Sequence, residues 1–466
     1  MTTAVPSPAR QADSVLRRSL RGSVYEGLLA MPLVYLNLPA NLVVATLLAE
    51  ALRVPPDVYG FLVSLPFWCN LLQVFIAPAL FRRWTARQVF LVTIGLNTGA
   101  WAGFAAVLAG APALVLARPG VVAGAFVFAA GLTTGVMSVA WTAYMQSWVP
   151  PGIRAVYFSR RNRVAQLSNL AFLLLAGFAL RWPTLPVIAG VMAFACGARV
   201  FSAVAALRTP AAGDPLPQGR PDWREQWRGL RGAREFWHMV LFGAAWGAVL
   251  NGFSAFQPVF MLSALTQTAQ EASLPLALSL LFGALALPAW GRLIDRFGAR
   301  PVLFVGVPLW ALVNVPWAFL TPDMRGLLFA AWAFTGAINA GIVLAQLNLL
   351  MKLMPAGAKG VAVGVNLAAA ALGTALAPIA AGLVLTWALA QGWPAIAVYH
   401  VFFMTLPPCA ALTLLVLRRV REPEAAPVEH VVGALRNFRT LACALGLGFL
   451  AQTLFTPRGK DRKSEY

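Results

Sequence analysis

Long apolar stretches, separated by short polar connections, recur along the whole chain. Each stretch is roughly 18 to 28 residues long, and an α-helix of that length crosses the hydrocarbon core of a membrane. The expected spans are residues 24–49, 58–81, 89–110, 120–148, 164–181, 184–206, 237–264, 274–291, 302–320, 326–350, 360–388 and 396–417. The pattern therefore predicts an all-α polytopic membrane protein with twelve transmembrane helices.

Two of the connections help to place the boundaries of these spans. The fifth and sixth spans are separated only by the sequence RWPTLP, in which Pro183 and Pro186 favour a tight turn. The sixth and seventh spans are separated by residues 207–236, which are rich in proline, glycine and charged residues. Such a segment is typical of a linker between two bundles.

Short sequence matches relate the two halves of the chain. ARQVFLV at 86–92 is similar to ARPVLFV at 299–305, and PPGIRAV at 150–156 is similar to PAGAKGV at 355–361. Because both matches occur in the same order and at the same place in each half, they predict six spans repeated in parallel orientation. The expected segments are residues 1–23, an N-terminal bundle of residues 24–206, the linker of residues 207–236, a C-terminal bundle of residues 237–417 and a basic tail of residues 418–466.

The composition supports the membrane assignment. Hydrophobic residues make up 59% of the chain, charged residues make up 11%, and the mean hydropathy is +0.72, far from the average of soluble domains. The formal net charge of +20 does not indicate a nucleic-acid partner, because a basic nucleic-acid-binding protein carries its charge on a polar, solvated surface.

The positive charge lies mainly on one side of the predicted membrane. Most of the 36 Lys and Arg residues fall in the terminal segments and in alternate connections, whereas Arg53, Arg118, Arg181 and Arg325 fall in the others. Cytoplasmic connections carry an excess of basic residues, so both termini are expected in the cytoplasm and the protein in the plasma (inner) membrane. The basic loops are expected to contact anionic lipid headgroups. The N-terminal segment does not have the pattern of a cleavable signal peptide.

One charged stretch, GRLIDRFGARPVL at residues 291–303, follows the eighth span. It resembles the signature loop of the major facilitator superfamily, which has the form G-x-L-x-D-R-x-G-R-[RK]. The matching residues are Gly291, Leu293, Asp295, Arg296, Gly298 and Arg300, with Arg300 displaced by one position. The resemblance covers residues 24–417. It implies two six-helix bundles related by a pseudo-two-fold axis and secondary transport by alternating access.

The first half departs from the family pattern. The loop between the second and third spans reads PALFRRWTARQ, with Pro78 at the position of the first glycine and Arg82 at that of the aspartate. The gating role is therefore assigned to the loop of the second half. Its glycines allow close helix packing, Asp295 can face the positive N-terminal end of a neighbouring helix, and its arginines can cross-link helix ends.

Polar side chains in the inner spans are the candidates for substrate contact. Asn37 and Asn41 share one face of the first span at a spacing of i, i+4. The other candidates are Asn70, Gln73, Trp141, Tyr144, Trp246, Asn251, Gln257, Asn339 and Gln346. Amide and aromatic groups suit a neutral or zwitterionic solute such as a sugar, a glycoside or a small metabolite. Interhelical packing is the alternative role for each of them.

Buried charge is scarce in the predicted spans. Glu26 lies near the cytoplasmic start of the first span and is expected to belong to an inner gate, paired with Arg17 or Arg21, or else to carry protons. Arg199 is expected to extend its guanidinium group to the membrane interface, with anion binding as the alternative. His400 is expected to serve packing. Facilitated diffusion, exchange and ion coupling remain alternatives.

No catalytic or cofactor motif is present in the sequence. The four cysteines lie in isolated positions without CxxC spacing, which predicts neither a metal site nor a disulfide framework. The three histidines are far apart, and the sequence has no HExxH or paired-carboxylate motif. We therefore expect a monomeric carrier without a metal or cofactor. A polytopic enzyme is disfavoured, and a drug exporter for lipophilic or cationic compounds, a lipid scramblase and a transporter-like receptor are the alternatives.

Two segments outside the spans have the pattern of amphipathic helices. In the linker, Trp223, Trp227 and Trp237 lie opposite arginines, as in a helix at the membrane interface. In the tail, apolar residues from Val431 to Phe449 recur every three or four residues. A thirteenth span over residues 440–456 is disfavoured, because it would move four basic residues to the outside.

Overall fold

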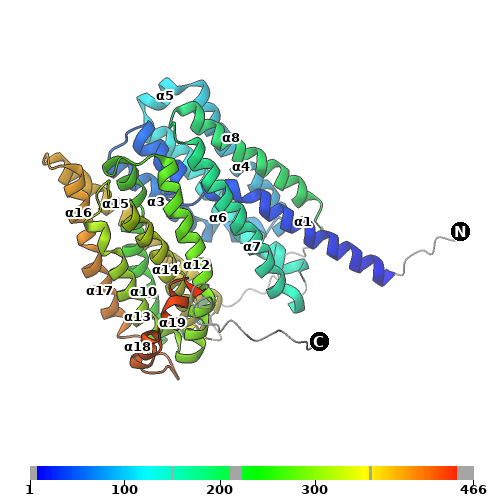
Figure 1. Cartoon of the computed structure of the whole chain (residues 1–466). Helices are drawn as coiled ribbons and strands as arrows, with labels where there is room; N and C mark the ends of the chain where they lie inside the picture. The colour runs from blue at the N-terminus through cyan, green and yellow to red at the C-terminus, as the bar shows by residue number, and fades with distance from the viewer. Residues whose placement is uncertain (1–7, 150, 210–222, 356–358, 449–466) are drawn as a thin grey trace, which may run out of the picture. The chain divides into compact units, whose positions relative to one another are not determined.

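The computed structural model describes residues 8–149, 151–209, 223–355 and 359–448. These residues form helices and connecting turns, with no strand among them (Figure 1). Ten helices in this part of the chain are long and apolar enough to cross a membrane. The first and fifth predicted spans are not among these ten, because the first is interrupted and the fifth carries arginines near its start. Counting them gives the twelve predicted spans.

The first half contains the helices α1 to α8. Their bounds are α1 Pro8–Leu36, α2 Leu42–Ala45, the π-helical turn η1 Thr46–Ala51, α3 Pro56–Phe81, α4 Ala86–Gly110, α5 Pro112–Ala117, α6 Pro119–Trp148, α7 Pro151–Ala179 and α8 Leu185–Leu207. The predicted turn between the fifth and sixth spans is confirmed, because α7 ends and α8 begins around Pro183. The short helix α5 was not predicted.

The second half contains the helices α9 to α19. Their bounds are α9 Trp223–Arg231, α10 Arg234–Ser254, α11 Gln257–Val259, the π-helical turn η2 Phe260–Ala264, α12 Ala269–Phe297, α13 Ala299–Asn314, the 3-10 turn η3 Val315–Ala318, α14 Arg325–Leu353, α15 Lys359–Ala390, α16 Ala395–Met404, α17 Leu406–Leu417, α18 Val428–Arg436 and α19 Phe438–Ala444. The predicted helix of the tail is divided at Asn437, and residues 449–466, with Phe449, lie outside the described residues.

Local sequence accounts for several helix ends. Thr85 and Gln88 form a reciprocal capping box at the start of α4. Proline occupies the first turn of α3, α6 and α8, where the missing N–H has no intrahelical partner to lose. Gly298, between α12 and α13, has a φ of 95° that favours glycine. These residues determine where the helices begin and end.

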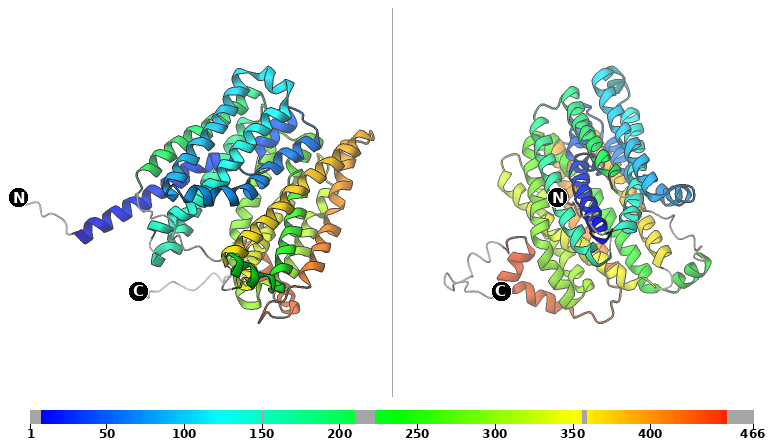
Figure 2. Two further views of the ribbon diagram at one scale, coloured as in Figure 1. Left: turned by 180° about the vertical axis from the view of Figure 1, so that it is seen from behind. Right: turned by 90° about the vertical axis from the view of Figure 1, so that its right-hand side faces the viewer.

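Contacts divide the chain into two compact units. The first comprises Met1–Trp223, Gly247–Ser273 and Val363–Tyr399, and the second comprises Arg224–Trp246, Leu274–Ala362 and His400–Tyr466. Within the first unit α1 packs against α7 and α8, and α4 packs against α6 and α8 (Figures 1 and 2). The predicted boundaries at residues 206 and 237 stay a prediction.

Small residues allow close packing within each unit. In the first unit a Cβ on Gly131 would lie 3.2 Å from Cys69 of α3. In the second unit the ring of Trp290 lies against Gly341, and its Nε1 donates to the carbonyl of Ala337 at 2.9 Å. Helices in lipid associate through such van der Waals packing and interhelical hydrogen bonds. Bulky apolar side chains such as Phe194 and Phe201 remain exposed on α8, as on a lipid-facing surface.

Candidate functional site

The first span is broken at residues 37–41, between α1 and α2. Ala40 adopts a positive φ of 52° there. The Asn41 side chain accepts a hydrogen bond from the N–H of Val44 at 3.0 Å, and its Nδ2 donates to the carbonyls of Leu36 and Leu38. Asn41 therefore satisfies backbone groups that the break would otherwise leave unpaired in an apolar environment.

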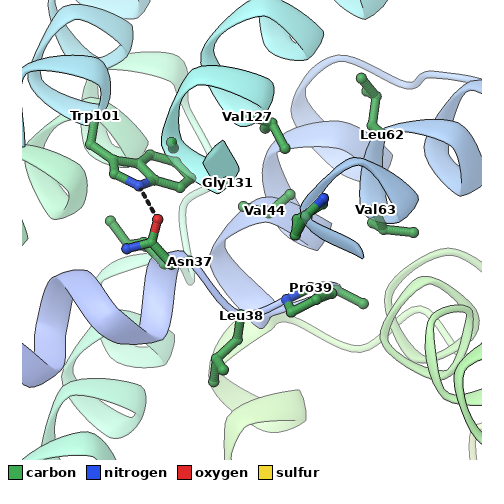
Figure 3. Close-up of a pocket in the computed structure, with 13 residues that line it drawn as sticks. Asn37, Leu38, Pro39, Val44, Leu62, Val63, Trp101, Val127 and Gly131 are labelled. Carbon is green, nitrogen blue, oxygen red and sulfur yellow. Dashed lines mark hydrogen bonds between the residues drawn. The ribbon is translucent and has the colours of Figure 1, made fainter. Parts of the chain in front are cut away.

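Asn37 lies at the same break and is linked to α4 directly and to α6 through Asn97. Its amide exchanges hydrogen bonds with Asn97 of α4 at 3.1 and 3.2 Å. Trp101 Nε1 donates to Asn37 Oδ1 at 2.9 Å (Figure 3). Asn97 is fully buried and also lies within 3.0 Å of the hydroxyls of Thr133 and Thr134 in α6. Asn97 and Trp101 were not among the residues predicted from the sequence. An amide within the apolar third span could have indicated Asn97.

A small cavity adjoins this network. It has a volume of about 20 Å³ and is lined by the break after α1 and by residues of α2, α3, α4 and α6, among them Asn37, Val44, Leu62 and Trp101 (Figure 3). A volume of this size has room for about one water molecule. The cavity beside Asn37 is therefore too small for an organic solute in this conformation.

The seventh span has a matching interruption. Asn37 precedes the π-helical turn η1 by nine residues, and Asn251 precedes η2 by the same nine residues. Asn251 Nδ2 donates to the carbonyl of Gly247 at 3.0 Å, and Gln257, which begins α11, is buried. In the first unit α11 and η2 contact α2 and η1. The first and seventh spans, which correspond in the predicted repeat, are thus interrupted at the same position.

The second unit contains a polar pair like that of Asn97 and Thr133. Asn314, at the end of α13, accepts a hydrogen bond from the Thr335 hydroxyl at 3.2 Å and donates to the carbonyl of Trp310. The buried ring of Trp246 lies edge-on to that of Trp310, with centroids 4.9 Å apart. Sequence reasoning also missed Asn314.

Several predicted amides have atoms without a partner. Gln73 Oε1 in α3, and Asn339 Oδ1 and Gln346 Nε2 in α14, are buried and have no hydrogen-bond partner among the described residues. Asn339 and Gln346 are seven residues apart and therefore share one helix face. An unsatisfied buried polar atom costs about 1 to 3 kcal/mol, so each of these atoms has an unmet capacity for a hydrogen bond.

The other predicted contacts have different surroundings. Asn70 is exposed, and a Cβ on Gly135 of α6 would meet its Oδ1 at 3.2 Å. The ring of Trp141 covers the guanidinium group of Arg161, 4.6 Å from the ring centroid. The Tyr144 hydroxyl lies 2.7 Å from that of Thr209. Trp141 and Tyr144 thus lie apart from the network of Asn37.

The signature loop has a helix cap that the sequence did not predict. The fully buried carboxylate of Glu422 accepts hydrogen bonds from the N–H groups of Ala299 and Arg300, at the start of α13, and from Lys352 Nζ at 2.6 Å. A Cβ on Gly298 would lie 3.1 Å from this carboxylate. The expectation that Asp295 faces a helix N-terminus differs from the structure, in which Asp295 is exposed and Glu422 caps α13.

The arginines of this loop contact aromatic rings. The guanidinium groups of Arg296 and Arg300 lie over the rings of Phe297 and Phe304, 5.0 and 4.8 Å from the centroids. Gly291 lies on α12 beside Leu344 of α14. The gating roles of Gly291, Asp295, Arg296, Gly298 and Arg300 stay a prediction.

Glu26 lies in a buried ion-pair cluster. Its carboxylate pairs with Arg161 at 2.7 Å and with Arg199 at 3.2 Å. The expected partner was Arg17 or Arg21, whereas the structure pairs this carboxylate with Arg161 and Arg199. Arg199 is only 2% exposed, so the expectation that it extends to the membrane interface is wrong. The carboxylate of Glu26 holds it inside the bundle instead.

The predicted outer ends of the spans meet closely within the first unit. The Asp57 N–H donates to the Thr386 hydroxyl at 3.0 Å, and that hydroxyl donates to Asp57 Oδ1 at 3.1 Å. A Cβ on Gly60 would collide with the carbonyl of Pro378, and one on Gly382 with that of Pro56. The Tyr59 hydroxyl donates to the carbonyl of Ala255 at 3.0 Å. These contacts hold α3 and α15 together at the end of this unit that is predicted to face outward.

Comparison with known proteins assigns the family. The sequence profile of the Major Facilitator Superfamily matches residues 28–266 and 254–458. A curated relative, the multidrug resistance protein MdtG of Citrobacter koseri, is 30% identical over 172 residues, which are 34% of this chain and 39% of the relative. The match thus spans well under half of that relative's length.

Solved structures share the fold. The nucleoside transporter NupG has a TM-score of 0.72 and 13% identity, with 86% of this chain and 100% of that chain covered. The xylose transporter XylE from E. coli, in a partially occluded inward open conformation, has a TM-score of 0.64 and 13% identity, with coverage of 89% and 100%. Together with the profile match and the twelve spans, this similarity shows that the chain belongs to the major facilitator superfamily, whose fold is two six-helix transmembrane bundles.

Proposed function

We propose that the protein is a secondary transporter that moves a small polar organic solute by alternating access. The observation that carries the proposal is the pair of unpartnered amide atoms on one face of α14, Asn339 Oδ1 and Gln346 Nε2. A buried amide without a partner destabilises the fold, and a polar solute would supply the missing hydrogen bonds. Asn251, in the matching seventh span, is a further proposed contact.

Two further features support alternating access. The close contacts at Asp57, Gly60 and Gly382 close the outer end of the first unit. The cavity beside Asn37 and Trp101 has room for about one water molecule. Such close-packed contacts tend to be either made or broken, as a two-state transporter requires. In this proposal the protein is a monomer of the plasma (inner) membrane, with both termini in the cytoplasm and with anionic lipids at its basic loops.

Export of lipophilic or cationic compounds is the second candidate. The partial similarity to the multidrug resistance protein MdtG favours it. A cation requires a carboxylate or an aromatic surface in the binding site. The two buried carboxylates in the described part of the chain, Glu26 and Glu422, are both paired with basic residues, which favours the polar solute.

Uptake into proteoliposomes tests the proposal. We would measure the uptake of labelled uridine, D-xylose and glutamate by the full chain, and then by Asn339→Leu, which removes the amide at similar volume. If the amide binds the solute, uptake should fall at least about tenfold, as expected when one ligand hydrogen bond is lost. The melting temperature should not fall, because Leu removes an unpartnered buried polar atom.

The matched control is Asn348→Leu on the same helix. Asn348 Nδ2 donates to the carbonyl of Leu344, within α14 itself. Because this amide already has a partner, uptake should stay within about twofold of the original rate. Equal rates for Asn339→Leu and the unchanged protein would reject the assignment of this site. Transport of lipophilic cations alone would favour the second candidate.

A further inference from the structure

A cluster of one acidic and two basic residues lies buried where α1, α7 and α8 meet. Glu26, Arg161 and Arg199 are each at most 6% exposed, and together they carry a net charge of +1. An uncompensated charge inside a membrane protein costs several kcal/mol. One arginine is enough to pair with Glu26 and link the helices. The presence of a second buried arginine therefore requires another explanation.

Arg161 is well satisfied by its neighbours. Its Nη2 donates to Glu26 Oε2 at 2.7 Å, and its Nε donates to the carbonyl of Ser23 at 3.2 Å. The ring of Trp141 covers its face, and Gly27 leaves the space that the guanidinium group occupies. Arg161 therefore forms the fixed part of the cluster.

Arg199 is satisfied along one edge only. Its Nη1 donates to Glu26 Oε1 at 3.2 Å and to the Ser202 hydroxyl at 3.1 Å. On the other edge, Nη2 faces the thioether sulfur of Met137 at 3.2 Å, and Nε has no hydrogen-bond partner among the described residues. A thioether is a weak acceptor. The Nε and Nη2 edge is the one that binds a carboxylate or phosphate through two parallel hydrogen bonds.

We propose that this edge of Arg199 binds a carboxylate or phosphate group of the transported solute, and that the Met137 side chain occupies the position of that group when the solute is absent. The proposal rests on the transport function proposed above and specifies its substrate class as an organic anion or a zwitterion. An oxyanion there balances the charge of the cluster, which a neutral solute or a cation does not.

Helix α6 provides a way to uncover the site. Met137 and Trp141 are one turn apart on it, and they cover Arg199 and Arg161, respectively. Met137 is unbranched and flexible, so it can leave Arg199 without disturbing the backbone. A displacement of α6 during the transport cycle uncovers both guanidinium groups together.

Thermal unfolding of the purified full chain with matched probes tests this proposal. The probes are glucose 6-phosphate against glucose and benzoate against benzamide, so that each pair differs mainly in the anionic group. We expect only the anionic member of at least one pair to raise the melting temperature, with an effect that grows with its concentration. Met137→Ala should lower the half-saturating concentration of that anion about fivefold to tenfold, because Arg199 no longer contacts the sulfur.

Met145→Ala is the matched control. Met145 is another buried methionine of α6, but its sulfur accepts from the Ser23 hydroxyl rather than from a guanidinium group, so its loss should leave anion binding unchanged. Arg199→Lys keeps the charge but removes the two-donor edge, and it should weaken anion binding about tenfold or more. If Arg199→Lys fails to fold, the comparison of Met137→Ala with Met145→Ala decides the question.

The outcomes separate the two proposals. No response of the unchanged protein and of Met137→Ala to either anion, or an equal effect of the two methionine substitutions, would overturn the anion site. Uptake of a neutral solute that depends on Asn339, without any anion response, would overturn the anion site and leave the proposed transporter intact. Absence of uptake for every solute in the proteoliposome experiment would overturn the transport function itself.

Discussion

At the scale of single residues, buried polar groups have partners that are distant in the sequence. Glu422 follows the twelfth span, yet it caps the first N–H groups of α13 and pairs with Lys352 of α14. A carboxylate favours the positive N-terminal end of a helix. The half-exposed Lys352 contributes little, because solvent screens its charge. Glu422 therefore stabilises the fold mainly through its hydrogen bonds to the backbone.

Glu422→Gln tests this cap. The Glu422 carboxylate accepts from two backbone N–H groups and one ammonium group, whereas the Gln side chain has a single acceptor oxygen. The free energy of unfolding should therefore fall by about 2 kcal/mol. The loss would be measured by unfolding in mixed detergent micelles. Glu424→Gln, two residues away on an exposed side chain, should have little effect, and an equal loss in both variants would contradict the role of the cap.

At the scale of helices, α3 and α15 approach each other closely at the end of the first unit that is predicted to face outward. Gly382 of α15 lies against the carbonyl of Pro56, and the contact leaves no space for a Cβ. Close backbone approach of this kind requires glycine. The first unit therefore depends on single hydrogen atoms at Gly60 and Gly382 to bring these two helices together.

Gly382→Ala should keep the outer ends of α3 and α15 apart. We expect uptake to fall at least about tenfold, because the transporter can no longer complete its cycle. Gly364→Ala is the control on the same helix, since no atom lies within 4 Å of the added Cβ. Full activity of Gly382→Ala in proteoliposomes would show that this contact does not form the gate.

At the scale of the whole molecule, the distribution of basic residues predicts the orientation in the membrane. The terminal segments and alternate connections hold most of the 36 Lys and Arg residues. Translocation of such segments is disfavoured, so they are expected on the cytoplasmic side. The same asymmetry accounts for the net charge of +20.

Cysteine labelling tests this orientation. In a variant without the four native cysteines, Gly433→Cys on the exposed face of α18 should react with a membrane-impermeant maleimide only in inside-out vesicles. Gln391→Cys, in the exposed turn after α15, should react only in intact cells. Reaction of both positions from the same side would contradict the predicted topology.

The sequence by itself determined the fold class and the number of spans. Crossing a membrane requires about twenty consecutive apolar residues, and this requirement is local, so the twelve stretches could be recognised without knowing their neighbours. The signature loop at Gly291–Arg300 and the repeated segments identified the family for the same reason: each is a short, contiguous pattern.

Only the tertiary structure decided which polar side chains are paired and which remain open. Asn97 bonds with Asn37 across 60 residues, and Arg199 pairs with Glu26 across 173 residues. A polar residue in an apolar span has the same sequence pattern whether it joins helices or binds a solute. The distinction depends on the partners that packing brings within about 3 Å, and no local pattern encodes them.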